Sequence, residues 1–177
     1  MKTRLCLFTL LLTSVTATLL VYGQGEKKPR TPADYKPRTL RELSTLQPDY
    51  IARDDTYKNS GTDLNIVVHA DLLPTRVRAT YEGTRRPLHE KRKLVIKQWA
   101  NHHAGAVESY TLPYQSEALF TENGENYWLA VRSDSLTKFD QELKKGETVE
   151  LFLIKMGNIR IDDKLEPVLL VENYLKQ

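Results

Sequence analysis

The sequence predicts a β-rich α+β fold in a single domain. Short runs of β-branched and aromatic residues recur from about residue 64 to the C-terminus, and turn-forming residues bound each run. Two stretches with helical periodicity separate these runs. Of the 177 residues, 23 belong to a predicted export signal, and the remaining 154 are enough for one domain with an adequate core.

The first 23 residues have the three parts of a secretory signal peptide. Lys2 and Arg4 form a positive n-region, residues 5–20 form an uncharged apolar run, and small or moderate residues precede a cleavage site after Gly23. We therefore expect a secreted or periplasmic mature protein. The alternative is an uncleaved membrane anchor, although the apolar run is somewhat short for a spanning helix.

Removing the signal changes what the composition implies. The chain has 26 Lys and Arg against 23 Asp and Glu, so losing Lys2 and Arg4 leaves a net charge of +1, which gives little support to wholesale phosphate binding. Cys6 is the only cysteine, so the mature protein has no thiol chemistry and no cysteine-bound metal. Without disulfides or a glycosylation sequon, the chain suggests a bacterial cell envelope.

A tether is expected between the signal and the folded domain. Residues 24–62 contain Pro29, Pro32 and Pro37 among polar residues, a composition that cannot bury a core. Residues 39–46 could form a short helix within it. The globular domain is expected to span residues 63–177.

The first elements of the domain are expected to be strands and a helix. Residues 64–69 read as a strand, Pro74 interrupts it, and residues 76–81 alternate with Arg76 and Arg78 on the outward face. Residues 86–103 read as a helix, because their apolar side chains share one arc at 100° per residue. Those apolar residues are Leu88, Val95, Ile96 and Trp99.

A hairpin, a helix and two strands complete the prediction. Asn123-Gly124 lies between apolar strands at 116–121 and 127–132, which is the strongest short hairpin signal. A helix beginning at Ser133 or Ser135 should end at Lys145-Gly146. Strands are expected at 148–155 and 168–171.

This order of elements, over about residues 75–175, resembles the OB-fold. The resemblance implies a small five-stranded antiparallel barrel with a helix between strands 3 and 4. An extra helix after strand 1 departs from the common plan. The chain is also similar to uncharacterised exported bacterial proteins in which a Tyr-Trp-Leu strand precedes a Leu/Phe helix and a Lys-Gly turn, here at Tyr127-Trp128-Leu129 and Lys145-Gly146. That similarity implies no activity.

No motif in the sequence predicts catalysis, a metal site or a cofactor. His89-Glu90 begins like a zinc-protease motif, but Lys93 stands where the second histidine would be needed. The chain has no nucleophile elbow and no glycine-rich phosphate loop. The remaining polar candidates are read as packed or solvated groups: His69, the pair His102-His103, and the acidic pairs Asp54-Asp55 and Asp162-Asp163.

Arginines and one tryptophan are the candidate ligand-binding residues. They are Arg76, Arg78, Arg85, Arg86, Trp128 and Arg132. Trp128 and Arg132 share one face of their strand, so an outward Trp128 would form a contact platform and an inward Trp128 would be core. The basic run at 85–97 is either a solvated helix face or an anionic-ligand patch.

Three functions are consistent with these features. The first is an exported, noncatalytic binding or interaction module whose partner is an unknown envelope protein or anionic ligand. The second is an envelope enzyme, such as a hydrolase, whose site is scattered through the fold. The third is binding of single-stranded nucleic acid or another anionic oligomer through the basic strand and helix, which the export signal and the near-zero charge disfavour for nucleic acid. Membrane contact is expected only through an uncleaved signal.

Overall fold

The computed structural model describes residues 30–45, 67–103, 107–162 and 164–177. The predicted signal (1–23) and two parts of the predicted tether (24–29 and 46–62, which include Asp54-Asp55) lie outside the described residues. So do the predicted strand residues 64–66, Asp163 and the side chains of His69, His102 and His103. Within the described ranges, no helix is long and apolar enough to cross a membrane.

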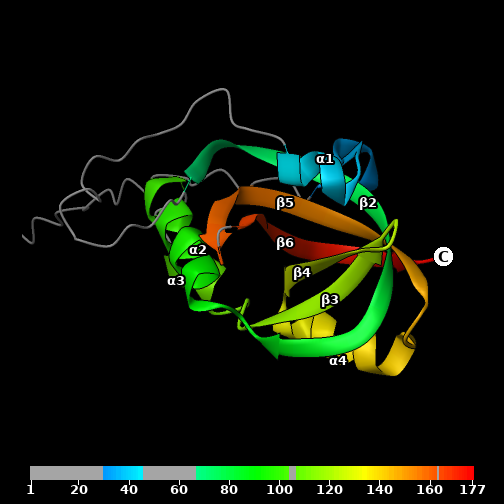
Figure 1. Ribbon diagram of the computed structural model, residues 1–177. Coiled ribbons are helices and arrows are strands. Elements are labelled where there is room, and N and C mark those ends of the chain that lie inside the picture. Colours follow the sequence, from blue (N-terminus) through cyan, green and yellow to red (C-terminus); the bar gives the residue numbers. More distant parts are fainter. Residues whose placement is uncertain (1–29, 46–66, 104–106, 163) are drawn as a thin grey trace, which may run out of the picture.

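Five strands close into a ring, and a sixth short strand lies on its edge (Figure 1). The ring contains β2 (Val67–Pro87), β3 (Ser116–Glu122), β4 (Glu125–Val131), β6 (Lys164–Lys176) and β5 (Thr148–Ile161), in that spatial order. Pairing of β5 with β2 completes it. The contact between β4 and β6 is parallel, and the other pairings within the ring are antiparallel.

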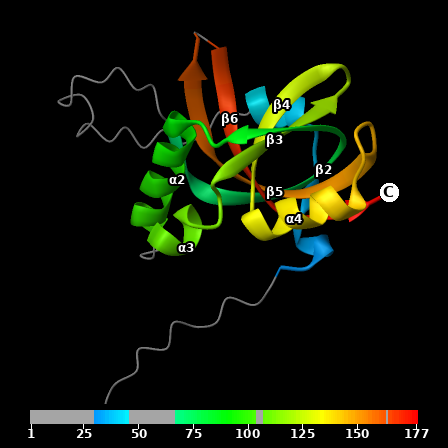
Figure 2. The ribbon, with the colours of Figure 1, turned by 90° about the horizontal axis from the view of Figure 1, so that it is seen from below.

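Four α-helices accompany the ring in the part of the chain that the structure describes. Two of them, α2 (Glu90–His103) and α3 (Val107–Thr111), lie together on one side, and α4 (Ser133–Glu142) lies apart from them (Figures 1 and 2). The Tyr174 hydroxyl of β6 donates a hydrogen bond to Glu142 at the end of α4. The remaining helix, α1 (Leu40–Thr45), is the first in the chain and follows a 3₁₀ turn (Pro32–Asp34) and β1 (Lys36–Pro37).

The structure corrects the predicted strand count and part of the pairing. The sheet has six strands rather than five, because β1 adds a two-residue parallel contact with β2 at Thr75 and Arg76. Two residues, one of them a proline, are too few to produce a strand pattern in the sequence. The pairing is also not wholly antiparallel, because β4 and β6 run in the same direction where they meet.

Several element boundaries also differ from the prediction. The strands expected at 148–155 and 168–171 are longer, as β5 (Thr148–Ile161) and β6 (Lys164–Lys176). Pro74 does not interrupt the first strand, because β2 continues through it. The pairing of β2 with β5 has a register shift between Val68 and Leu73, just before the proline. The first long helix begins at Glu90 rather than residue 86, because residues 85–87 extend β2 and pair with β3. The helix α3 was not predicted.

The predicted hairpin is confirmed. Residues 116–122 and 125–131 pair in register, and the turn between them has positive φ at both Asn123 (52°) and Gly124 (81°). Positive φ at both central residues is the type I′ geometry that Asn-Gly favours. The predicted helix that follows this hairpin is also present, as α4.

Buried side chains form two clusters on opposite faces of the ring strands. All five ring strands contribute to the inner cluster, together with Leu136, Phe139 and Leu143 of the α4 region. The outer cluster joins α2 to Ala130, Ile154 and other outward side chains of β4, β5 and β6. Alternation along each strand produces this division, so that Leu129 and Val131 point inward while Ala130 points outward.

Residues 30–45, within the predicted tether, pack against the domain. Leu40 and Leu43 are fully buried in the inner cluster, and α1 confirms the short helix expected at 39–46. Tyr35 packs edge-on against Phe152, and its hydroxyl donates a hydrogen bond to Glu172. The packed domain therefore includes residues N-terminal to position 63.

Candidate functional site

The six predicted ligand-binding residues do not form one groove. Arg76 and Arg78 lie on β2 opposite Phe152 and Glu150 of β5. Arg85 pairs with Asp140 of α4, and Arg132 pairs with Asp134 at 3.1 Å.

Only Arg86 and Trp128 come together. The guanidinium carbon of Arg86 lies 3.9 Å from the centroid of the Trp128 ring, which is a cation–π contact. Trp128 is half-buried and shares its outward face with Ala130, since Leu129 between them belongs to the inner cluster. The Trp128 side chain therefore lies on the outer face of β4, the orientation in which it could form a contact platform.

A buried carboxylate fixes the orientation of Arg86. Glu117 is the cross-strand partner of Arg86, and its side chain has no exposed surface. The Arg86 Nε–H donates a hydrogen bond to Glu117 Oε1. The guanidinium is therefore tied at Nε and stacked on an indole, which limits its rotamers before any ligand arrives.

A second arginine neutralises the same carboxylate from beneath. Arg92 of α2 is 1% exposed, and its Nε lies 3.3 Å from Glu117 Oε2. Its two terminal nitrogens donate to the Trp128 carbonyl and to Glu166 of β6. Arg92 thus joins α2 to β3, β4 and β6 through one side chain.

These four charged groups form an ionic cluster of Arg86, Arg92, Glu117 and Glu166 beside Trp128. The two positive and two negative charges balance, which is what burial of ions requires. Exposure rises from the fully buried Glu117 and Arg92 to Glu166 and then Arg86, whose side chain is 40% exposed. The cluster therefore reaches solvent chiefly through Arg86.

Arg86 offers unused donors to solvent. Its Nε–H is bonded to Glu117, and its other four N–H groups have no hydrogen-bond partner among the described residues. A planar fork of this kind matches a carboxylate or a phosphate in two parallel hydrogen bonds. The arrangement can therefore recognise an anion.

Sequence reasoning missed Arg92 and Glu117. Arg92 does fall on the apolar arc of its helix, four residues after Leu88 and seven before Trp99, so its burial had a detectable signal. Glu117 had no such signal, because the polar residue of an alternating strand is normally solvated. Its burial follows from α2 covering the outer face of the sheet.

The other polar candidates take local roles. His89 Nδ1 accepts a hydrogen bond from the Lys91 amide at 3.2 Å. No group of three or more His, Cys, Asp or Glu side chains that could hold a metal ion occurs in the part of the chain that the structure describes.

Comparison of the sequence with known protein families finds no family model that matches, and comparison with curated proteins finds no matching relative.

Proposed function

We propose that this protein is an exported, noncatalytic binding module with an OB-like barrel, and that it recognises an anionic group on its ligand through Arg86. The spatial order β2-β3-β4-β6-β5, closed by β2, supports the OB-like assignment. So does the position of α4 between the third and fourth ring strands. The extra helices α2 and α3 fill the connection after the first ring strand.

The stacking of Arg86 on Trp128 carries this proposal. In OB-folds the ligand lies on the face of the second and third strands, which are β3 and β4 here. Trp128 lies on the outer face of β4, and Arg86 is held over it from the adjoining end of β2. A recognition group thus occurs on the face where this fold binds ligands.

The ligand is proposed to be an acidic polymer of the cell envelope, bearing carboxylates. Arg86 covers the indole ring at 3.9 Å, so that face of Trp128 is occupied by the guanidinium rather than open to a neutral sugar or a base. The predicted mature charge is near zero, which disfavours a polyphosphate backbone as the main ligand.

Binding of the purified protein to polygalacturonate tests the proposal, with neutral dextran and single-stranded DNA as comparison probes. Arg86→Ala is expected to weaken polygalacturonate binding by about tenfold or more, since loss of a charge-assisted hydrogen-bonded pair is worth about 1.5–3 kcal/mol. Arg78→Ala is the matched control. It removes the same charge, and Arg78 is exposed and lies on the same strand.

Equal losses in Arg78→Ala and Arg86→Ala would mean that net charge alone drives binding, and would overturn the site. Preferential binding of single-stranded DNA would favour the nucleic-acid alternative. Arg86→Lys separates geometry from charge: it is expected to bind almost as poorly as Arg86→Ala, because an ammonium cannot reproduce the bidentate fork.

A further inference from the structure

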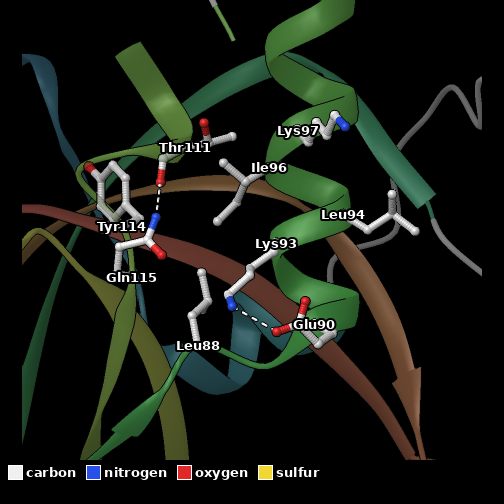
Figure 3. A pocket seen from close by; sticks show the side chains of 9 residues that line it. All are labelled: Leu88, Glu90, Lys93, Leu94, Ile96, Lys97, Thr111, Tyr114 and Gln115. Atoms are coloured by element: carbon white, nitrogen blue, oxygen red, sulfur yellow. Dashed lines mark hydrogen bonds and ion pairs between the residues drawn. The ribbon is translucent and has the colours of Figure 1, made fainter. Parts of the chain in front are cut away.

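A groove separates α2 from the segment that follows α3. It has a volume of about 510 Å³, within the range of small-molecule sites. Figure 3 shows the side chains that line it, which come from α2, from Leu88 just before α2, and from residues 111–115. They are Leu88, Glu90, Lys93, Leu94, Ile96, Lys97, Thr111, Tyr114 and Gln115.

The floor of the groove is apolar and fixed. Leu88, Ile96 and Tyr114 are each at most 5% exposed and belong to the outer cluster. The opposite wall is braced by the Gln115 side-chain amide, which donates a hydrogen bond to the Thr111 carbonyl at 2.7 Å. The floor side chains are already packed in the outer cluster, so binding would not have to order them.

The mouth of the groove is cationic. Lys93 and Lys97 lie one helical turn apart on α2. Lys93 is paired with Glu90 at 2.7 Å, but Glu90 is 84% exposed, and an exposed pair of this kind contributes little. Lys97 has no ion-pair partner among the described residues. One positive charge at the mouth is thus left over.

We propose that this groove binds a small amphiphile that has an apolar chain and a carboxylate head. The chain would lie along the groove between α2 and residues 111–115, and the head would take the place of Glu90 as partner of Lys93 while Lys97 supplies the second positive charge. The groove has this combination of an apolar floor and a cationic mouth independently of Arg86. This inference therefore goes beyond the proposed function.

Titration calorimetry with decanoate below its micelle threshold tests the inference, with decanol as the uncharged comparison. The wild-type protein is expected to bind decanoate at least about tenfold more tightly than decanol, a difference of about 1.4 kcal/mol. The double variant Lys93→Met/Lys97→Met keeps the apolar stems and should lose this preference. Lys138→Met, an exposed lysine on α4, is the control and should not change it.

Glu90→Gln gives a prediction of the opposite sign. It removes the carboxylate that competes with the ligand head for Lys93, so decanoate should bind about two- to fivefold more tightly, as expected for release of a surface ion pair. Equal affinity for decanoate and decanol, or a weaker Glu90→Gln variant, would overturn the inference.

Methyl NMR locates the ligand without relying on a variant. Decanoate is expected to shift the methyl signals of Leu88, Leu94 and Ile96, and not that of Leu175 on β6, which is exposed. Shifts confined to exposed leucines would show nonspecific binding and overturn the site. Lys93→Met/Lys97→Met should leave polygalacturonate binding unchanged, so failure of the proposed function and failure of this inference are distinguishable.

Discussion

At the scale of single residues, buried charges are the unusual feature of this protein. Glu117 and Arg92 have almost no exposed surface, and their charges are balanced by one another, by Arg86 and by Glu166. Desolvating two ions costs several kcal/mol each, and their attraction repays this cost only when every partner is present. Removing one member of the cluster therefore lowers the free energy of unfolding more than replacing a buried ion pair by two apolar residues does.

We predict that Glu117→Gln lowers the free energy of unfolding by about 3–5 kcal/mol, because the buried Arg92 loses its buried counterion and keeps only the partly exposed Glu166. Urea denaturation measures the change. Glu90→Gln, which removes an exposed carboxylate from α2, should change stability by less than about 1 kcal/mol.

The double variant Arg92→Met/Glu117→Leu separates charge from packing. It should recover most of the stability that Glu117→Gln loses, since well-packed apolar residues often match a buried ion pair. A double variant as unstable as Glu117→Gln would mean that the loss comes from shape rather than from charge.

Lys155 makes stability depend on pH. It is fully buried, and its ammonium donates a hydrogen bond to the Leu43 carbonyl at 2.6 Å. Burial lowers its pKa from 10.5 to about 8. Between pH 8 and 10.5 the unfolded chain therefore binds a proton that the folded chain has released, and stability rises with pH across that window.

From pH 7.5 to 9.5 the wild-type protein is expected to gain on the order of 1–2 kcal/mol of stability that the Lys155→Met variant does not gain. Denaturant unfolding at the two pH values measures the difference. Burial raises the pKa of Tyr35 from 10.0 to about 12, and the effect of this group on stability is common to the wild type and the Lys155→Met variant, so it cancels in the comparison. Identical pH slopes for the two proteins would contradict the assignment.

At the scale of elements, the N-terminal segment shows how short elements escape sequence reasoning. Its prolines and charges indicate a tether, yet residues 36–45 form β1 and α1 and place Leu40 and Leu43 in the inner cluster. The Glu122 carboxylate accepts hydrogen bonds from the Leu40 and Arg41 amides, which satisfies the start of α1. Two leucines and one carboxylate are enough to dock a six-residue helix.

We predict that Leu43→Ala destabilises the whole domain by about 2–5 kcal/mol, as for other buried leucines. Leu112→Ala, at a leucine that is 66% exposed, should have an effect within about 0.5 kcal/mol. Thermal or urea unfolding of both variants checks this. A silent Leu43→Ala would mean that α1 is not part of the cooperative unit.

Longer elements were easier to predict. The hairpin and α4 carry local signals, Asn123-Gly124 and the periodicity of Leu136, Phe139 and Leu143, and both signals agree with the tertiary structure. The start of α2 was misjudged because Pro87 suits a first helical turn and also the end of a strand. In the structure, Arg86 pairs with Glu117 of β3, so Pro87 ends the strand β2 and does not begin α2.

At the scale of the whole molecule, closure of the ring couples the two clusters. The strands β4, β5 and β6 contribute side chains to the inner and the outer cluster at the same time. Loss of either cluster exposes one face of these strands, so we expect the domain to unfold as one unit.

The two tryptophans allow a test of this coupling. Trp99 belongs to the outer cluster and Trp128 lies on the same face, whereas far-UV circular dichroism reports the strands themselves. The fluorescence and dichroism transitions in urea are predicted to coincide. A fluorescence transition at lower urea would show that α2 detaches first, and would contradict a single cooperative unit.

The sequence by itself determined the β-rich class, the hairpin, the amphipathic helices and the inward residues of β2, because these depend on patterns within a few residues, but it left the direction of Trp128 open. It did not determine the sixth strand, the parallel contact of β4 with β6, or the burial of Arg92, Glu117 and Lys155. Of the six candidate residues, only Arg86 and Trp128 meet, since the ring places the others against different neighbours. Contacts between distant segments are fixed by how the strands close, and no local pattern records that closure.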